Sequence, residues 1–458
     1  MPRVLVVTYQ WLPLVNVGVK HLANLCRCLP GMGWEPHILT KDWSEGPAPE
    51  DTHWGMTAQP TDAIPSLKHA ATLPVVRASY ARRDNRWLRR EARLEAEANN
   101  GFGADAIVRH VLTAAYPLYG HYPDAHRGWV EPAVTAGLVA VRQYGISAVL
   151  SVCPPASAHL VGGEIARRAG IPWVPLFADL ATFYLGPDDG RSRRLRWKHR
   201  LLNRHWLQGA ARSAGSSPWM VEYVRATYGI GGDMIVLPFD PEERRVAPHR
   251  DAGSPMRVVH IGILHPNAER LDLLFDALDQ LLASGSCDAG AMTVDLVGSG
   301  CDAWLAEQIR NRPCEAMVRM VERVAPAEAV RMQREADVLL LFNHANATPG
   351  ATGGALGYPS AMFEHLNAAR PTIAIAADPG GTVGTLLSET NAGQTAEDAP
   401  SLGAVLLDYV KELRSRGRIG FRGDEAAIAR YGAPEQAKRL ASLLDAASAE
   451  RFGTWQRA

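Results

Sequence analysis

The chain has 458 residues, of which 47% are hydrophobic and 21% are charged. This composition is that of an ordinary globular protein, and it excludes a disordered chain, a coiled coil and a collagen-like fibre. Lys and Arg together number 48, as do Asp and Glu, so the chain lacks the basic excess of a dedicated nucleic-acid binder. Because a single core stops growing at roughly 250–300 residues, the length predicts two domains.

Several site chemistries are absent from the sequence. The six cysteines are sparse and form no Cys-x-x-Cys pair, which argues against a zinc site or a disulfide framework and favours reduced thiols in the cytoplasm. No P-loop, no HExxH motif, no Asp-x-Asp triplet and no GxGxxG after the first strand occur. No stretch reaches about 18 apolar residues, and the short apolar run at residues 3–8 indicates a strand rather than a signal peptide.

The first half of the chain alternates strands and helices. Apolar patterning predicts strands at 3–8, 34–40, 147–152, 172–177 and 234–237, and helices at 19–29, 130–144, 160–169 and 220–228. Residues 44–125 interrupt this order and are predicted to be an insertion with one or two helices, because the segment begins rich in Pro and Thr and becomes charged and helix-prone near 77–99.

The second half repeats the alternation after a segment in which proline, glycine and charge concentrate. It is predicted to contain strands at 258–263, 292–297, 317–321, 336–342 and 371–375, and helices at 271–283, 303–310, 327–335 and 360–369. The pattern predicts an α/β protein with two doubly wound domains, 1–240 and 257–434, joined by a linker at 241–256. An amphipathic helix in 435–458 is expected to pack back on the first domain.

The segment from Gly353 to Pro371 carries the clearest site chemistry. A glycine-rich loop, Gly353–Gly357, precedes a helix for which Ser360 is a suitable N-cap. The free N–H groups and the dipole at a helix start attract phosphate. Glu364 lies one turn into this helix, where its carboxylate can accept two hydrogen bonds from a ribose diol, and we expect it to lie outside the core. The alternative is a carboxylate that only favours the helix dipole.

This segment resembles the donor-site motif of GT-B glycosyltransferases, specifically the retaining family-4 group. The matching residues are Pro359-Ser360, Phe363-Glu364 and Arg370-Pro371. Further matches to this group occur in the same order along the chain: Pro123-Asp124, Gly128-Trp129, Ser151 to Leu160, Gly170 to Val174 with Asp179, Leu237-Pro238 with Asp240 to Glu242, Gly262 to His265 with Arg270, and Gly298-Ser299-Gly300.

The resemblance implies a GT-B fold, with two Rossmann-like domains facing a central cleft, and a role in carbohydrate biosynthesis. A sugar would pass from a nucleotide-diphosphate sugar to the hydroxyl of a glycan, a lipid-linked acceptor or a small molecule, with retention and without a metal or other cofactor. It also implies the donor-binding residues: the backbone at Val324 and Ala325 for the base, Glu364 for the ribose, and Arg270 and the loop with Gly354, Gly357 and Ser360 for the diphosphate. Gly18, Gly262 and Gly298 are the remaining donor-binding residues that the resemblance implies.

Two residues of the first domain are candidates for catalysis. His159 follows a Pro-Pro loop at the end of a predicted strand, and Asp179 follows the next strand, where loops line the crevice of such folds. His159 would contact the transferred sugar or the acceptor hydroxyl, and Asp179 would contact the acceptor or act as general base. The alternatives are a histidine that forms a helix-cap bond and an ordinary turn aspartate.

Departures from the family pattern keep other functions open. Leu356 replaces a glutamate, Ala361 replaces a lysine, and only Gly18 remains of the first glycine loop. A nucleotide-sugar epimerase of the same architecture and a non-catalytic glycosyltransferase-like binding protein are the alternatives. Two basic, tryptophan-containing segments, 77–93 and 191–206, predict peripheral contact with an anionic membrane surface or a phosphorylated acceptor, or else solvated helix faces.

Overall fold

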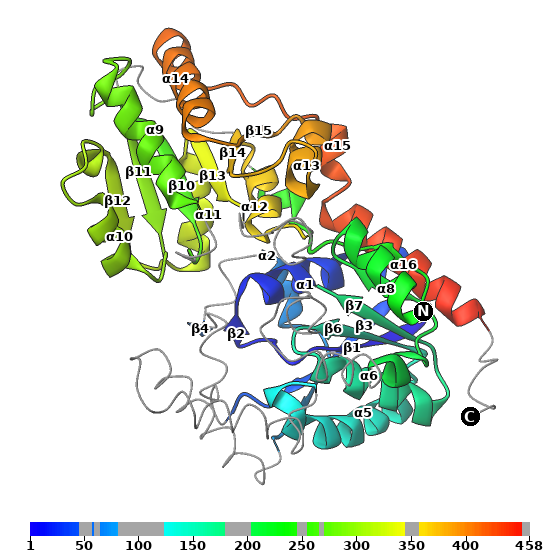
Figure 1. The fold of residues 1–458 in the computed structure, drawn as a ribbon. Helices are drawn as coiled ribbons and strands as arrows, with labels where there is room; N and C mark the ends of the chain where they lie inside the picture. Colours follow the sequence, from blue (N-terminus) through cyan, green and yellow to red (C-terminus); the bar gives the residue numbers. More distant parts are fainter. Residues whose placement is uncertain are drawn as a thin grey trace. The chain divides into compact units, whose positions relative to one another are not determined.

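The structure is a computed structural model that describes residues 1–44, 57–58, 65–80, 123–178, 203–244, 254–264, 270–343 and 357–450. The chain divides into two compact units, Met1–Leu237 with Gln436–Ala458, and Pro238–Glu435. Each unit is a parallel sheet with helices on both faces (Figure 1). Within the described ranges, none of the helices has the length and apolarity that a membrane span requires.

The first unit is built on a seven-stranded sheet in the order β5-β3-β1-β6-β7-β8-β9. Its strands are β1 (Arg3–Val7), β3 (Glu35–Lys41), β5 (Val75–Ala78), β6 (Ala148–Cys153), β7 (Trp173–Phe177), β8 (Ser213–Gly215) and β9 (Gly232–Met234), beside a separate antiparallel pair, β2 (Leu14–Val15) and β4 (Thr57–Ala58). Its helices are α1 (Val17–Cys28), α2 (Pro65–Ala70), α5 (Val130–Tyr144), α6 (Ser157–Ala169) and α8 (Pro218–Tyr228), with the short 3₁₀ helices η1 (Leu29–Met32) and η4 (Ala125–Trp129).

The C-terminal helix α16 (Ala433–Ala449) completes one face of this sheet. Ala437, Leu440 and Leu444 join the apolar cluster that contains side chains of α1, α2 and the sheet. The indole N–H of Trp34 also donates to Asp445 at 3.0 Å. Helices α5, α6 and α8 pack on the opposite face through a second apolar cluster, so the unit has three layers.

The second unit is built on a six-stranded sheet in the order β12-β11-β10-β13-β14-β15. Its strands are β10 (Met256–Ile261), β11 (Met292–Val297), β12 (Val318–Val321), β13 (Val338–Phe342), β14 (Thr372–Ile375) and β15 (Gly393–Ala396). Its helices are α9 (Leu271–Ala283), α10 (Asp302–Ile309), α11 (Pro326–Glu335), α12 (Ala361–Ala368), α13 (Thr382–Thr390), α14 (Ala399–Arg416) and α15 (Glu425–Ala429), with the 3₁₀ helices η6 (Pro241–Glu243) and η7 (Glu315–Met317).

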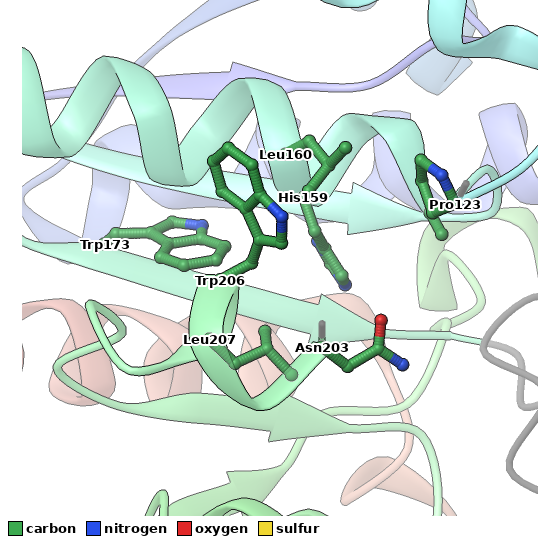
Figure 2. Close-up of a pocket in the computed structure, with 8 residues that line it drawn as sticks. Pro123, His159, Leu160, Trp173, Asn203, Trp206 and Leu207 are labelled. Atoms are coloured by element: carbon green, nitrogen blue, oxygen red, sulfur yellow. The ribbon is translucent and has the colours of Figure 1, made fainter. Parts of the chain in front are cut away.

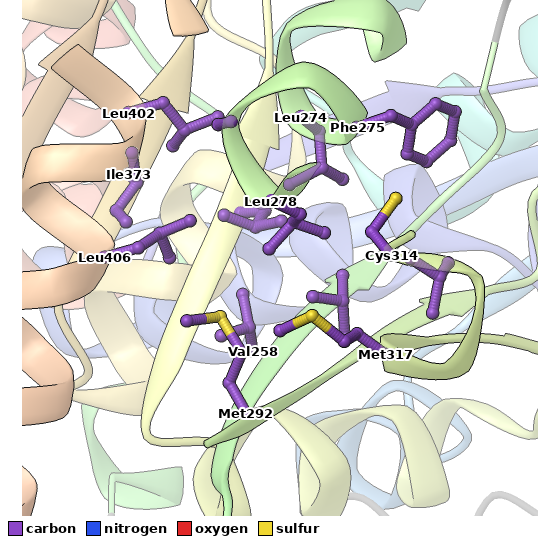
Figure 3. Close-up of a cluster of buried hydrophobic side chains, with 14 of the residues drawn as sticks. Val258, Leu274, Phe275, Leu278, Met292, Cys314, Met317, Ile373, Leu402 and Leu406 are labelled. Carbon is purple, nitrogen blue, oxygen red and sulfur yellow. The ribbon is translucent and has the colours of Figure 1, made fainter. Parts of the chain in front are cut away.

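The largest apolar cluster of the second unit lies between its sheet and helices α9 and α14. Figure 3 shows Val258 and Met292 of the sheet against Leu274 and Leu278 of α9, with Leu406 of α14 alongside. A smaller cluster lies on the other face and includes Ala336 and Ala368. Strand order reverses between β10 and β13, and in open α/β sheets ligands bind at such a reversal, at the carboxyl ends of the strands.

Most predicted elements occur within a few residues of their predicted bounds, but three regions differ. Strand β5 lies inside the predicted insertion at 44–125 and pairs in parallel with β3 at the edge of the sheet. The strand predicted at 234–237 is β9, which begins and ends earlier. Beyond residue 375, the strand β15 and helices α13, α14 and α15 were not predicted, because glycine, proline and polar residues interrupt their apolar patterns.

Candidate functional site

The predicted donor residues of the second unit gather at the carboxyl edge of its sheet. Gly262 follows β10, Gly298 follows β11, and Val324 and Ala325 lie between β12 and α11. Backbone hydrogen bonds tie these turns together, because the Gly262 N–H donates to the Val297 carbonyl at 3.0 Å and the Gly298 N–H donates to the Val321 carbonyl at 2.9 Å. The structure therefore brings these four residues to one edge.

Two glycines in these turns have backbone angles that side chains rarely adopt. Gly262 has a φ of 154° and Gly298 a φ of 66°. A methyl group added at Gly298 would also lie 3.5 Å from the Cα atom of Arg323. The loops after β11 and β12 therefore approach each other closely at this position.

The start of helix α12 differs from its prediction in two ways. Ser360 occupies the N-cap position, but its φ of −57° and ψ of −31° are helical and its side chain makes no cap hydrogen bond. A capping serine normally has an extended backbone, so the predicted cap is wrong. Glu364 is only 8% exposed, so the expectation that it lies outside the core is also wrong. Glu364 shares this burial with every other residue of α12 from Met362 to Ala368.

Arg270 immediately precedes α9, and its guanidinium is already paired. Nε lies 2.9 Å from Asp272 Oδ1, and Nη2 lies 2.6 Å from Asp272 Oδ2. The hydrogen bonds to Asp272 raise the pKa of Arg270, and the same contact lowers the pKa of Asp272. The Arg270 side chain is 49% exposed, so a diphosphate that approached it would have to compete with this carboxylate.

Arg370, part of the matched motif, has a structural role. It is buried, and its Nε donates to the carbonyl of Arg334 at 3.0 Å, at the C-terminal end of α11. A guanidinium at this end of a helix satisfies a terminal carbonyl and complements the helix dipole. The guanidinium of Arg334 in turn donates to the carbonyl of Glu243, which ties η6 to α11.

Sequence reasoning missed two buried histidines in this unit. His260, on β10, places Nδ1 3.1 Å from the carbonyl oxygen of Leu340 and its ring 5.0 Å from that of Phe342. Burial lowers the pKa of His260 to about 4, against a smaller opposing effect of the Leu340 and Gly262 backbones. His365, on α12, has its pKa lowered to about 3, chiefly by burial and then by His260, while the charge of Glu364 opposes the shift. One signal was available, since a lone histidine interrupts the apolar run of β10.

His159 lies in the first turn of α6, inside the first unit. The indole N–H of Trp173 donates to Ser151 Oγ at 2.8 Å, and Ser151 Oγ lies 2.7 Å from His159 Nδ1. Ser151 Oγ therefore accepts from the indole and shares a second hydrogen bond with His159 Nδ1, whose direction depends on the tautomer of the imidazole. Burial lowers the pKa of His159 to about 3.

A small pocket surrounds this histidine. Figure 2 shows the His159 imidazole extending from α6 between Trp173 of β7 and the helical turn that carries Asn203 and Trp206. The other lining residues are Pro123, Ala156, Leu160 and Leu207. The pocket is therefore largely apolar, and its polar side-chain groups are the His159 imidazole, the Asn203 amide and the indole N–H groups of Trp173 and Trp206.

The matched Pro123-Asp124 segment is tied to the start of α6. The carboxylate of Asp124 accepts hydrogen bonds from the N–H of His126, the N–H of Ser157 at 2.8 Å and the hydroxyl of Ser157 at 2.6 Å. A carboxylate at the N-terminus of a helix is stabilised by the dipole and by the free N–H groups. This contact holds the Pro-Asp segment against the start of α6.

The remaining predicted site residues are only partly described. Gly18 is the second residue of α1, whose N-terminus is capped by Asn16 through a 2.9 Å bond from the Val19 N–H. Gly357 lies just before α12, and apart from its chain neighbours no atom of the described residues lies within 4 Å of the place where its side chain would begin. Asp179, His265, Gly354, Leu356 and most of the two basic segments lie outside the described residues. Among those that are described, no three His, Cys, Asp or Glu side chains are placed to hold a metal ion.

Comparison with known proteins yields matches among solved structures alone. No protein-family model matches the chain, and no curated protein matches its sequence. Anabaena HepE in complex with UDP-glucose has a TM-score of 0.59 at 13% identity, over 97% of this chain and 99% of that one. The lipopolysaccharide outer core galactosyltransferase WaaB has a TM-score of 0.54 at 11% identity, over 97% and 99%.

A third similar structure is sucrose-phosphate synthase from Thermosynechococcus elongatus, with a TM-score of 0.52 at 12% identity over 98% of this chain and 96% of that one. These likenesses extend over nearly the whole of each chain, and they agree with the two parallel sheets of the present structure. The predicted fold class is therefore confirmed, and the chain has the GT-B fold of these glycosyltransferases.

Proposed function

We propose that this chain is a glycosyltransferase that moves a sugar from a nucleotide-diphosphate sugar to an acceptor hydroxyl. The carboxyl edge of the second sheet carries the proposal, because Gly262, Gly298 and the Val324-Ala325 backbone meet there, at the position where open α/β sheets bind ligands. HepE, a protein of the same fold, has been solved with UDP-glucose.

In this proposal the second unit binds the donor. The base lies against the Val324-Ala325 backbone, Glu364 accepts hydrogen bonds from the ribose, and the N–H groups at the start of α12 receive the diphosphate. The Ser360 hydroxyl does not occupy those N–H groups as a cap. Stabilising the charge that develops on the departing nucleotide is then the main catalytic contribution. Arg270 would assist only after exchanging its bond to Asp272 for one to phosphate.

The stereochemistry, the metal requirement and the acceptor class are inferred from the resemblance to the retaining family-4 group. We infer retention at the anomeric carbon, independence of metal ions, and an acceptor that is a glycan, a lipid-linked intermediate or a small molecule. His159 and Asp179 of the first unit are the candidates for contact with the acceptor or the transferred sugar. The two basic segments are candidates for contact with an anionic membrane surface on the cytoplasmic side.

The test is a panel of radiolabelled nucleotide sugars, with binding, hydrolysis and transfer measured for each. We expect one donor to bind in the micromolar range and to be hydrolysed slowly in the absence of acceptor. No binding and no hydrolysis with any donor would refute the proposal. A sugar that changes configuration without an acceptor would instead identify a nucleotide-sugar epimerase.

A non-catalytic binding protein is the second candidate. The pairing of Arg270 with Asp272 favours it, because the predicted diphosphate cation is already neutralised. Ala361, in place of the family's lysine at the start of α12, removes another cation. Calorimetry separates the two candidates, since absence of heat with uridine, guanosine and thymidine diphosphates would favour the binding protein.

A further inference from the structure

The N-terminus of α1 lies where the order of the first sheet reverses. From β1 the chain passes through α1 to β3 on one side, whereas β6 lies on the other side of β1. In open α/β sheets, ligands bind outside the carboxyl ends of the strands at such a reversal. The turn between β1 and α1 holds Gln10 and Asn16, and these two side chains determine which hydrogen-bonding groups are present at this position.

Two hydrogen bonds set the orientation of the Gln10 amide. Asn16 caps α1, because its Oδ1 accepts from the Val19 N–H at 2.9 Å. Its Nδ2 is the amide atom that remains, and it donates to Gln10 Oε1 at 2.7 Å. Since Oε1 of Gln10 is the acceptor in this bond, the other end of the amide is Nε2, which carries two hydrogens and can only donate.

Nε2 of Gln10 is a donor that the protein leaves without a bond. Gln10 is only 7% exposed, and Nε2 has no hydrogen-bond partner in the part of the chain that the structure describes. It is also not one of the unpaired polar atoms that are sealed from solvent. Buried polar groups are rarely left unpaired, because their desolvation is costly. This donor is therefore available to water or to a ligand, beside the N-cap of α1.

The start of α1 supplies further donors. The N–H groups of Val17 and Gly18 make no hydrogen bond within the described ranges, and Val17 is 46% exposed. Apart from chain neighbours and the backbone of the helix, the only described atom within 4 Å of where a Gly18 side chain would begin is Asn16 Oδ1. α1 has no acidic residue in its first turn, so no carboxylate of the helix offsets the positive end of its dipole. Such a group of donors favours an oxyanion.

We propose that the start of α1 and the Gln10 amide bind an oxyanion, a phosphate or a carboxylate, that the acceptor carries. The inference rests on the proposed function, which assigns the donor diphosphate to the start of α12 in the second unit. A second oxyanion position, in the unit that carries the candidate acceptor contacts His159 and Asp179, then requires an anionic group on the acceptor. In this inference Gly18 contacts the acceptor, whereas the resemblance implies contact with the donor.

Binding is followed in the unaltered, ¹⁵N-labelled protein through the backbone N–H resonance of Gly18 and the side-chain NH₂ resonances of Gln10. Inorganic phosphate, acetate and glucose are added separately at constant ionic strength, with and without a saturating nucleoside diphosphate. We expect phosphate or acetate to shift the resonances of both residues whether or not the nucleotide is present, and glucose to shift neither. The anion that binds more tightly shows whether a phosphate or a carboxylate is preferred.

Gln10→Glu changes the proposed contact alone. The substitution keeps Oε1 as the acceptor for Asn16 but replaces the Nε2 donor with a carboxylate oxygen, which repels an anion. We expect the affinity for phosphate or acetate to fall about tenfold or more. Gln333→Glu is the matched control, because this glutamine of α11 is 6% exposed and receives the same charge away from α1. The control should bind the anion as the wild type does, and thermal melting checks that both variants are folded.

The possible outcomes separate this inference from the proposed function. The absence of any shift with either anion, or an unchanged anion affinity in folded Gln10→Glu, overturns the inference. So does a phosphate response that disappears when the nucleoside diphosphate is bound, because the donor then occupies the position itself. If Gln10→Glu does not fold, the resonances of the unaltered protein decide alone. A protein that binds no nucleotide refutes the proposed function, whereas one that binds nucleotide but no oxyanion at Gly18 refutes only this inference.

Discussion

Glu364→Gln is the most direct test of the donor site. The substitution preserves the volume of a side chain that is 8% exposed, so the packing of α12 is kept. It removes the negative charge and one of two equivalent acceptor oxygens, so two ribose hydroxyls can no longer donate equally. Hydrogen bonds to a charged group are worth roughly 1.5–3 kcal/mol. We therefore expect the affinity for a nucleoside diphosphate to fall about tenfold to a hundredfold.

The assay is calorimetric titration of the variant and the wild type, with urea unfolding as a check of stability. Glu412→Gln is the matched control, because this glutamate of α14 is also largely buried, at 13% side-chain exposure, and lies outside the candidate site. The control should bind as the wild type does. If Glu364→Gln stays folded and its nucleotide affinity and turnover are unchanged, the ribose is not bound where we propose.

Three further predictions follow from the structure. Asp272→Asn frees the guanidinium that this carboxylate now holds, so a nucleoside diphosphate should bind several times more tightly while the free nucleoside binds unchanged; equal changes for both in calorimetry would contradict a diphosphate contact. Gly163→Ala places a methyl group 2.9 Å from Trp173 Cζ3 and should cost about 1–3 kcal/mol of stability in urea, whereas Gly18→Ala, whose nearest neighbour would lie 3.4 Å away, should cost nothing. Burial lowers the pKa of His159 to about 3 in the folded protein, against 6.5 for an exposed imidazole. Between these two values the unfolded chain binds a proton that the folded chain does not. The free energy of unfolding should therefore fall as the pH drops from 7 toward 4, by roughly 1.4 kcal/mol for each pH unit below the unfolded pKa. A urea midpoint that is equal at pH 7 and pH 5 would contradict this sign.

Much of the fold could be predicted because local patterns determined it. Helices α5 and α9 have the predicted bounds, since each combines apolar residues at helical spacing with a clear end, such as the left-handed Gly145 after α5. Strand β5 could not be predicted in the same way. Its four residues are mostly half-exposed, and only their pairing with β3, more than thirty residues earlier in the chain, makes them a strand.

Some features of the candidate site could likewise be predicted from the sequence, and others could not. Glycines at turns and the motif around Glu364 are visible as short sequence patterns, so their position at one sheet edge could be predicted. The environment of His260 could not, because its partners Leu340 and Phe342 come from β13, some eighty residues later. Arg370, a residue of the matched motif, binds the carbonyl of Arg334, and the sequence pattern alone did not indicate this partner.

The helix α16 has a consequence for how the protein is made. The first unit draws its core from both ends of the sequence, and the Val236 N–H is bonded to Gln436 Oε1 across 200 residues. The second unit, in contrast, is one continuous segment, Pro238–Glu435. On the ribosome, the second unit is therefore available in full before α16 emerges. The part of the protein that is synthesised first is the last to be completed, and until then the apolar cluster to which α16 contributes Ala437, Leu440 and Leu444 stays incomplete and open to chaperones or to premature association.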